Sequence, residues 1–289
     1  MLCGLTALLL TAALTLPIQA MEGGQESVSQ ETAEESRPPC RHRKKMPAAS
    51  CLNEGINWYC PKAADGVRRL DGGMALVERY DVHWHDPSAE EDDKVLYLTF
   101  DAGYENGNVE KILDILKEKS VPGAFFVLEH FISANPGLIR RMAEEGHLVC
   151  NHTASHRDMS RVAGREEFAA ELKKLEDTCR SVTGVEMAKF YRPPEGRFSE
   201  SNLAHADEMG YSTILWSMAY ADWDNDRQPS PDAAKEKLLK GTVNGDIILL
   251  HPTSATNAAI LGDLIDAWTA QGYRFGSLAE LSKKSEANA

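Results

Sequence analysis

The chain has 289 residues, with 31 Lys or Arg against 44 Asp or Glu, so its formal net charge is −13. This acidic balance argues against nucleic acid as a partner, because a polyanion repels a chain of the same sign. The length accommodates one large α/β domain of roughly 200 to 250 residues together with accessory segments. The six cysteines include no CxxC pair, which argues against a cysteine zinc site.

The first 20 residues carry no charged side chain and contain the apolar run LTALLLTAALTL before a short segment that ends at Ala20. This pattern predicts a signal peptide over residues 1–20, and with it a secreted or envelope-facing protein. A single membrane anchor is the alternative. The apolar run is shorter than the ~20 residues that a membrane span needs, so export is favoured.

Residues 21–50 are rich in Glu, Ser, Pro and Gln and have no hydrophobic period, which is typical of a disordered linker. The linker closes with a basic cluster, Arg41 to Lys45. Such a cluster would allow a loose association with an anionic envelope surface, although a solvated linker is the simpler interpretation.

Residues 51–90 contain several aromatic residues without a clear period, which predicts an N-terminal extension packed on the domain that follows. The aromatic residues are Trp58, Tyr59, Tyr80 and Trp84. The string HWH at positions 83–85 offers two imidazoles, but in such an extension packing is favoured over metal ligation.

From Lys94 onward, strand and helix signals alternate almost to the end of the chain. The expected strands are Val95–Phe100, Gly123–Leu128, His147–Asn151, Lys189–Arg192, Ser212–Ser217, Asp246–Leu250 and Tyr273–Gly276. The expected helices are Val109–Lys119, Pro136–Glu145, Arg165–Thr183, Ser199–Met209, Pro231–Leu239 and Asn257–Gln271. Repeated βα units predict a parallel sheet covered by helices. About seven such units over residues 91–285 predict a closed or nearly closed (β/α) barrel, a distorted relative of the TIM barrel.

Polar residues follow five of the predicted strands, at the end where a barrel assembles its active site. They are Asp101, His152 with His156, Arg192, Asp222 with Trp223, and His251. Alone, a histidine at such a position is more often a hydrogen-bonded structural residue, and an aspartate often caps the next helix. Their convergence on one end of one sheet indicates an active site.

In the segment NHTASH, His152 and His156 are four residues apart. This spacing places two imidazoles on one helical face and suits a divalent metal. The alternative is a capped helix start with a surface histidine. Two histidine ligands leave coordination positions open for water and substrate, as catalytic metal sites require.

Five segments in order, TFDAGYENG, NHTASH, RPPEGRF, the DW of AYADWD, and ILLHP, resemble the motifs of the polysaccharide deacetylase family with its NodB-type domain. The resemblance extends over about Val95 to Leu281. Within the family the chain is most similar to the spore-cortex, δ-lactam-forming peptidoglycan de-N-acetylases. The segments that carry this likeness are GYENG, NWYC at Asn57–Cys60, and WSMAYADW.

The resemblance implies roles for the residues at the strand ends. His152 and His156 would hold the metal, and Asp101 would be the general base. His251 would protonate the departing amine, Arg192 would orient Asp101, and Asp222 would hold His251 and favour its charged form. In most family members a second acid follows the base and completes the metal site, but here that position is Ala102. A site poorer in carboxylate and richer in nitrogen favours zinc over magnesium or calcium.

The resemblance also implies substrate contacts. Trp223 would line the sugar subsite, Tyr104 in GYENG would contact the glycan, and the backbone N–H of Glu195 would face the oxyanion. Muramic acid carries a lactyl carboxylate, and Arg197 is the cation in RPPEGRF placed to bind it.

The function that the resemblance implies is removal of the acetyl group from N-acetylmuramic acid in peptidoglycan strands, followed by closure to muramic δ-lactam in spore cortex. Lactam formation needs a lactyl group freed of its peptide, so an N-acetylmuramoyl amidase is the expected pathway partner. The alternative enzyme is an N-acetylglucosamine deacetylase acting on peptidoglycan or chitin. From another class, Ala102 allows a non-catalytic glycan-binding protein on the same scaffold.

Overall fold

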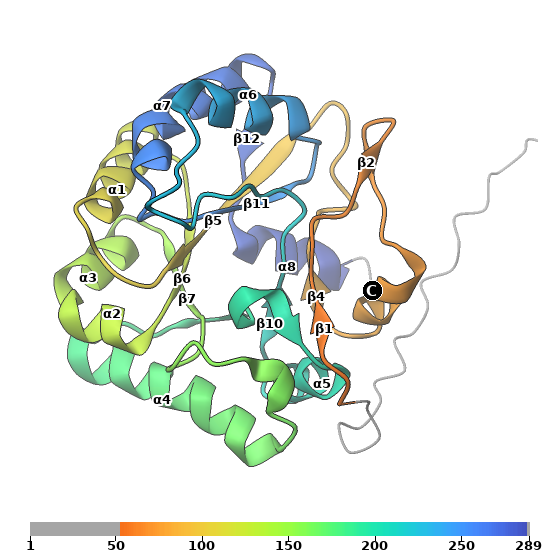
Figure 1. Cartoon of the computed structure of the whole chain (residues 1–289), viewed down its shortest axis with the longest axis vertical. Coiled ribbons are helices and arrows are strands. Elements are labelled where there is room, and N and C mark those ends of the chain that lie inside the picture. The colour runs from red at the N-terminus through yellow and green to blue at the C-terminus, as the bar shows by residue number, and fades with distance from the viewer. Residues whose placement is uncertain (1–52, 288–289) are drawn as a thin grey trace, which may run out of the picture. The chain divides into compact units, whose positions relative to one another are not determined.

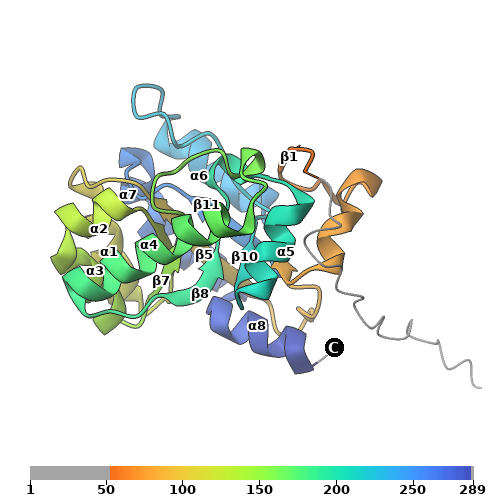
Figure 2. The same ribbon diagram turned by 90° about the horizontal axis from the view of Figure 1, so that it is seen from below.

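The computed structural model describes residues 53–287. The signal peptide and the linker expected over residues 1–50 lie outside the described residues. Most of the described chain forms one sheet with helices around it, drawn in Figures 1 and 2. Among residues 53–287, no helix is long and apolar enough to span a membrane.

The sheet has eight strands, and each expected strand is present. In spatial order they are β11 (Ile247–Leu250), β5 (Val95–Ala102), β6 (Ala124–Val127), β7 (Leu148–Asn151), β8 (Ala188–Tyr191), β10 (Ser212–Ile214) and β4 (Val82–His83), with β12 (Arg274–Phe275) beside β5. All these pairs are parallel. Between the chain after β10 and β11, the strand pairing is one isolated bridge, Met218 to Ile248, and hydrogen bonds of Ser217 and Met218 to β11 accompany it. The sheet is therefore the predicted distorted (β/α) barrel, with a short seam between those two segments.

Helices follow the strands, as the βα alternation predicts. They are α1 (Asn108–Lys119), α2 (Glu129–Ala134), α3 (Pro136–Glu144), α4 (Arg165–Thr183), α5 (Glu200–Glu208), α6 (Pro231–Gly241), α7 (Ala255–Ala270) and α8 (Leu278–Ala287). The six expected helices are confirmed, whereas α2 and α8 had no distinct sequence signal. In α4, the buried residues Phe168, Leu172, Leu175 and Cys179 recur every three or four positions, so one stripe faces the sheet.

Strand β5 shows how the sheet points its side chains. Its even-numbered residues, from Leu96 to Ala102, lie in the core between sheet and helices. Val95 and Tyr97 instead join the second core, which fills the barrel and includes Leu278 and Leu281 of α8. Because side chains alternate along a strand, Thr99 and Asp101 share the inward face of Val95 and Tyr97. Asp101 therefore lies on the inward face of β5, at the end of the barrel where this strand terminates.

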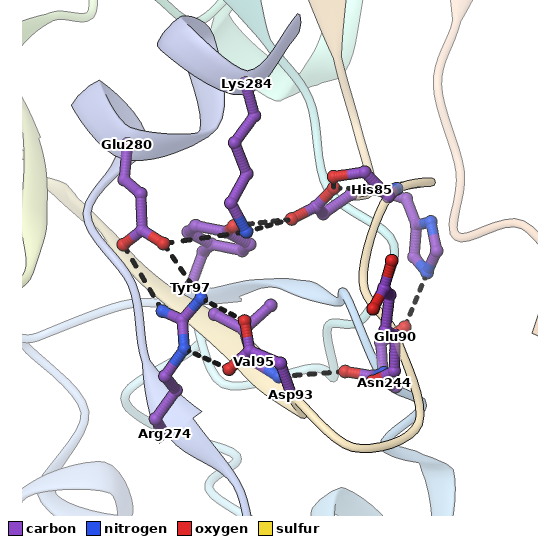
Figure 3. Close-up of polar contacts among 11 residues, drawn as sticks. His85, Glu90, Asp93, Val95, Tyr97, Asn244, Arg274, Glu280 and Lys284 are labelled. Atoms are coloured by element: carbon purple, nitrogen blue, oxygen red, sulfur yellow. Dashed lines mark hydrogen bonds and ion pairs between the residues drawn. The ribbon is translucent and has the colours of Figure 1, made fainter. Parts of the chain in front are cut away.

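The opposite end of the barrel is held by a polar network, shown in Figure 3. The hydroxyl of Tyr97 donates to the buried carboxylate of Asp86 at 2.6 Å, and Lys284 of α8 lies 3.7 Å from the same carboxylate. Arg274 of β12 bonds to Asp93 and Glu280. These contacts fix α8 and β12 against the start of β5, far from the end that carries Asp101.

The segment expected as an N-terminal extension contributes short elements to this architecture. These are β1 (Ile56–Asn57), β2 (Ala63–Ala64), β3 (Val67–Arg68), the 3-10 helix η2 (Gly72–Arg79) and β4. Strand β4 extends the sheet beyond β10, and β1 pairs antiparallel with β9 (Arg197–Phe198). Figure 1 shows β1 and β4 in orange near β10.

A buried ion pair from this segment supports the seam of the barrel. Arg68 on β3 makes a two-pronged contact with Asp246 just before β11, at 2.9 and 2.7 Å. It also donates to the carbonyl of Gly241. Both charged side chains are almost fully buried, with 6% and 0% of their side-chain surface exposed. The extension is thereby tied into the barrel wall.

Candidate active site

The polar residues predicted at the strand ends are brought together at one end of the barrel. Asp101 lies near the end of β5, His152 follows β7, Arg192 follows β8 and His251 follows β11. Asp222 lies in the segment after β10 and contacts His251. Next to His152 and Arg192, the pairing of β7 with β8 shifts register between Cys150 and Asn151. Such irregularities re-aim the residues at a strand's end, and here they bring Arg192 beside the loop that holds His152.

Arg192 is fully buried and fixes the carboxylate of Asp101. Its Nη1 donates to Oδ1 of Asp101 at 2.7 Å, and its Nη2 donates to Thr99 at 2.9 Å. Its Nε donates to the carbonyl of Ile214, and the guanidinium lies 4.1 Å from the ring centre of Phe126. Hydrogen bonds thus hold the edge of the guanidinium, and the ring of Phe126 packs against its face. Together these contacts fix its orientation.

The environment keeps Asp101 ionised. Burial raises the pKa of its carboxyl, but the charge and hydrogen bond of Arg192, together with the nearby imidazoles of His152 and His251, outweigh burial and hold this pKa below the ordinary value. A carboxylate that is charged and oriented at neutral pH is suited to accept a proton.

His152 presents one nitrogen to the site. Its Nδ1 lies 2.9 Å from the carbonyl oxygen of Arg192, which only accepts hydrogen bonds, so Nδ1 carries the proton. Its Nε2 lies 3.6 Å from Oδ2 of Asp101. Burial lowers the pKa of His152 to about 4, despite the opposing charge of Asp101. The imidazole is therefore neutral at neutral pH and has a lone pair on Nε2.

The expectation that His152 and His156 lie on one helical face is wrong. The segment between them is a loop in which Thr153 and His156 have positive φ angles of 71° and 54°. The amide of Thr153 donates to Asn151, and the amide of His156 donates to the hydroxyl of Thr153. These local hydrogen bonds compete with a helix and fold the loop back on itself. The two rings nevertheless meet edge to face, with centroids 5.0 Å apart.

The two imidazoles suit a metal that keeps open coordination positions. Histidines that bind metals typically donate their other ring N–H to a carbonyl, which fixes the tautomer, and His152 does so to the carbonyl of Arg192. In residues 53–287 there is no cluster of three or more His, Cys, Asp or Glu arranged to hold a metal. Ala102, at the position of the family's additional acid, is fully buried in the core between sheet and helices. The structure therefore places the imidazoles of His152 and His156 together, with the carboxylate of Asp101 beside His152.

His251 is held by a second carboxylate. Oδ1 of Asp222 lies 2.8 Å from its Nδ1, and Oδ2 accepts from its backbone amide at 2.7 Å. Burial lowers the pKa of His251, but the hydrogen bond and charge of Asp222 outweigh burial and raise this pKa above the ordinary value. A protonated imidazole held by a buried carboxylate is suited to donate a proton.

Two supporting residues were missed at the sequence level. Thr99 accepts from Arg192 and itself donates to the carbonyl of Ile248. Asn257 at the start of α7 donates to Asp222 at 2.6 Å and to the carbonyl of His251 at 3.0 Å. The one signal in the sequence was the polar pair Ser254 and Asn257 shortly after His251, which reads equally well as a helix cap.

The turn in RPPEGRF has an unusual backbone. Pro194 to Gly196 form the 3-10 turn η4, in which Glu195 adopts a left-handed conformation with φ 57° and ψ 9°. The side chain of Glu195 is exposed. Arg197 contacts Asp158 at 3.2 Å and Glu195 at 3.9 Å, both through Nη1, while its Nε is buried without a hydrogen-bond partner in the described structure.

Tyr104 and Trp223 are exposed aromatic residues in the segments that follow β5 and β10. Tyr104 is 47% exposed and Trp223 is 65% exposed, which is rare for large aromatic side chains. The amide of Asn225 donates to the hydroxyl of Tyr104, which joins the loop after β5 to the segment after β10. Exposed aromatic faces of this kind are suited to pack against sugar rings.

The strand ends of this barrel hold a carboxylate fixed by an arginine, a pair of imidazoles, and a further imidazole fixed by a carboxylate. This combination is typical of a hydrolase that cleaves acyl groups. Residues 88–214 match the model of the polysaccharide deacetylase family. The chain is 37% identical over 244 residues to the peptidoglycan-N-acetylmuramic acid deacetylase PdaA of Bacillus subtilis, covering 83% of this chain and 90% of that protein. This chain belongs to the polysaccharide deacetylase family.

Two further comparisons agree. The solved structure of Bacillus subtilis PdaA, described as a family 4 carbohydrate esterase, matches with a TM-score of 0.75 at 35% identity, covering 81% of this chain and 99% of that one. A peptidoglycan-N-acetylglucosamine deacetylase of Bacillus cereus is 32% identical over 193 residues, covering 65% of this chain and 68% of that protein.

Proposed function

We propose that this protein removes the acetyl group from N-acetylmuramic acid in peptidoglycan strands and that the product closes to muramic δ-lactam in spore cortex. The observation that carries the proposal is a pair of contacts in the site, between Asp101 and Arg192 and between His251 and Asp222. Despite burial, Arg192 holds the pKa of Asp101 below its ordinary value, and Asp222 raises the pKa of His251 above its ordinary value. Strands β5 and β11 pair with Phe100 opposite Leu250, so Asp101 and His251 follow at neighbouring positions on the same end of the barrel. Amide hydrolysis needs a base for the water and an acid for the nitrogen.

In this mechanism Asp101 accepts the proton of the water that attacks the acetyl carbonyl. Arg192 keeps the carboxylate ionised and pointed at that water. The developing oxyanion accepts a hydrogen bond from the backbone N–H of Glu195, as the family resemblance implies. His152 and His156 would hold a divalent metal, for which zinc best suits two imidazoles; when bound, it supplies Lewis-acid polarisation of the carbonyl and of the water.

His251 completes the reaction. An amide nitrogen leaves poorly until it is protonated, so the collapse of the tetrahedral intermediate requires a proton on nitrogen. The imidazolium of His251 supplies that proton, and Asp222 stabilises the charged ring until then. The products are acetate and a free amine on the sugar.

Arg197 supports the choice of muramic acid. Both of its ion-pair contacts use Nη1, and its Nε has no partner. An arginine binds a carboxylate side-on through Nε and a terminal nitrogen, and in the described structure Nε makes no hydrogen bond. The lactyl carboxylate of muramic acid is the substrate group with the matching charge. Nε is buried in this structure, so side-on binding of the carboxylate requires the loop around it to move.

The same proposal sets the cellular context. The free lactyl carboxylate must first be produced by an N-acetylmuramoyl amidase, which is therefore the pathway partner. The enzyme would be exported by the segment 1–20 and would act at the envelope or the spore, with at most loose association through the basic cluster Arg41 to Lys45.

Deacetylation of N-acetylglucosamine in peptidoglycan or chitin is the second candidate, favoured by the name of the Bacillus cereus relative. A non-catalytic glycan-binding protein is the third, but binding alone needs neither the Asp101–Arg192 pair nor the His251–Asp222 pair. One experiment separates the three. The purified protein is incubated with peptide-stripped peptidoglycan, and the muramidase digest is analysed by mass spectrometry. Lactam-bearing or deacetylated muramic acid supports the proposal, deacetylated glucosamine supports the second candidate, and an unchanged digest supports the third.

A further inference from the structure

The turn that carries Glu195 has a backbone that needs external support. Glu195 and Gly196 are successive left-handed residues, with φ angles of 57° and 65°. Within the turn, the amide of Gly196 donates to the carbonyl of Pro193 at 3.1 Å. A side chain on Cβ disfavours the left-handed conformation, so Glu195 holds it only where neighbours over-determine the turn. The position of the Glu195 N–H depends on those neighbours.

Trp58, from the N-terminal segment, is the neighbour bonded to this turn. Its backbone amide donates to the carbonyl of Gly196 at 2.8 Å, next to the pairing of Asn57 with Arg197. Its indole N–H donates to the carbonyl of Trp216 at 2.8 Å. The side chain of Trp58 is 5% exposed, so this contact is shielded from water.

Trp216 contacts both the turn and Trp58. A Cβ built on Gly196 would lie 2.7 Å from the ring of Trp216 and 3.1 Å from Cβ of Trp58, so the turn sits directly on both tryptophans. The ring of Trp216 also lies 5.7 Å from the guanidinium carbon of Arg192. One aromatic ring thus contacts the turn and flanks the arginine that holds Asp101.

We propose that Trp58 is a positioning residue for the reaction: through Gly196 and Trp216 it fixes the turn that presents the Glu195 N–H to the oxyanion. This inference rests on the proposed function for its catalytic consequence. The positioning itself concerns only the chain's own backbone. Trp58 lies outside residues 88–214, which the family model matches. The N-terminal segment therefore contributes to the active site as well as to the barrel wall.

The test compares three variants of the full chain. Trp58→Phe removes the indole N–H and keeps a ring, and Trp58→Ala removes both. Trp84→Phe is the matched control, because the Trp84 ring packs 6.1 Å from that of Trp58, while no hydrogen bond in the described structure joins it to the turn. Hydrogen–deuterium exchange of the peptide spanning residues 195–199 reports the order of the turn without any substrate. Acetate release reports kcat and KM.

We expect faster exchange of that peptide in both Trp58 variants and wild-type exchange in Trp84→Phe. We expect kcat to fall by about 10- to 100-fold in Trp58→Ala and by less in Trp58→Phe, with KM little changed, because a small misplacement of a catalytic donor has an effect of this size. Unchanged exchange in folded Trp58→Phe overturns the inference. Equal loss of kcat in Trp84→Phe does so too, because it assigns the effect to general packing. If the wild-type protein releases no acetate, the proposed function fails, while the exchange data still decide whether Trp58 orders the turn.

Discussion

The guanidinium of Arg192 lies 2.7 Å from the carboxylate of Asp101, and neither group has another charged partner as close in the described site. Arg192 is fully buried, so the contact is shielded from solvent and from salt. Arg192 therefore both stabilises the charged form of the Asp101 carboxylate and fixes its orientation.

The first prediction concerns Asp101→Asn. The amide keeps the shape of the carboxylate and can still accept from Arg192, but it cannot take a proton from water. We expect kcat for acetate release to fall by roughly 10² to 10⁴, the usual contribution of a general base. The control is Asp93→Asn at the opposite end of the barrel, where the side chain pairs with Arg274. Wild-type turnover in Asp101→Asn would show that another group is the base.

The second prediction concerns pH. Asp101 must be ionised and His251 protonated, so activity is expected between the two pKa values. The lowered pKa of Asp101 puts the acid limb below the ordinary titration range of an aspartate, and the raised pKa of His251 puts the alkaline limb above that of a histidine. Asp222→Asn removes the charge that raises the pKa of His251, and burial then lowers that pKa. The alkaline limb of kcat/KM should move to lower pH, and a limb that stays in place would contradict the role of His251.

The third prediction concerns the metal. His156→Ala removes one of the two imidazoles, and we expect zinc affinity to fall by more than the 10- to 100-fold that loss of an outer-shell partner causes. The measurement is the metal content of the purified variant, together with activity before and after chelation and zinc addition. His130→Ala, an exposed histidine on α2, is the control. Full activity of the wild-type protein after thorough metal removal would refute the metal-assisted mechanism.

The sequence predicted the barrel because its strands and helices differ in hydrophobic period, as in β5 and α4. It did not predict β4, since a strand of two residues, Val82 and His83, has no measurable period. The polar residues at the strand ends could be picked out because the strands, and so their ends, could be predicted. The path of the loop from His152 to His156 could not be predicted, because hydrogen bonds of Asn151 and Thr153 determine it. Asn257 was missed because its partner Asp222 lies 35 residues away along the chain.

The fourth prediction concerns substrate choice. Arg197→Ala removes the cation proposed to bind the lactyl carboxylate, and a charge-assisted hydrogen bond contributes about 1.5–3 kcal/mol. We expect kcat/KM to fall roughly 10- to 100-fold on peptide-stripped muramic acid glycans and to change little on N-acetylglucosamine oligomers. Arg161→Ala is the matched control, since Arg161 also contacts Asp158, at 3.3 Å, but is far more exposed. Equal losses on both substrates would leave Arg197 with no part in specificity.

The last prediction concerns the barrel seam, where Arg68 meets Asp246. Asp246 is fully buried, and besides Arg68 its carboxylate accepts hydrogen bonds only from the hydroxyl of Ser217 and the amide of Val243 in the described structure. Arg68→Ala leaves this carboxylate buried without a countercharge, so we expect the free energy of unfolding to fall by about 3–5 kcal/mol in urea titrations. Arg180→Ala breaks the exposed pair with Glu186 and should barely move the urea midpoint, because water already screens that pair. A comparably small shift in Arg68→Ala would mean that water enters the seam and solvates Asp246, and the N-terminal segment would then not close the barrel.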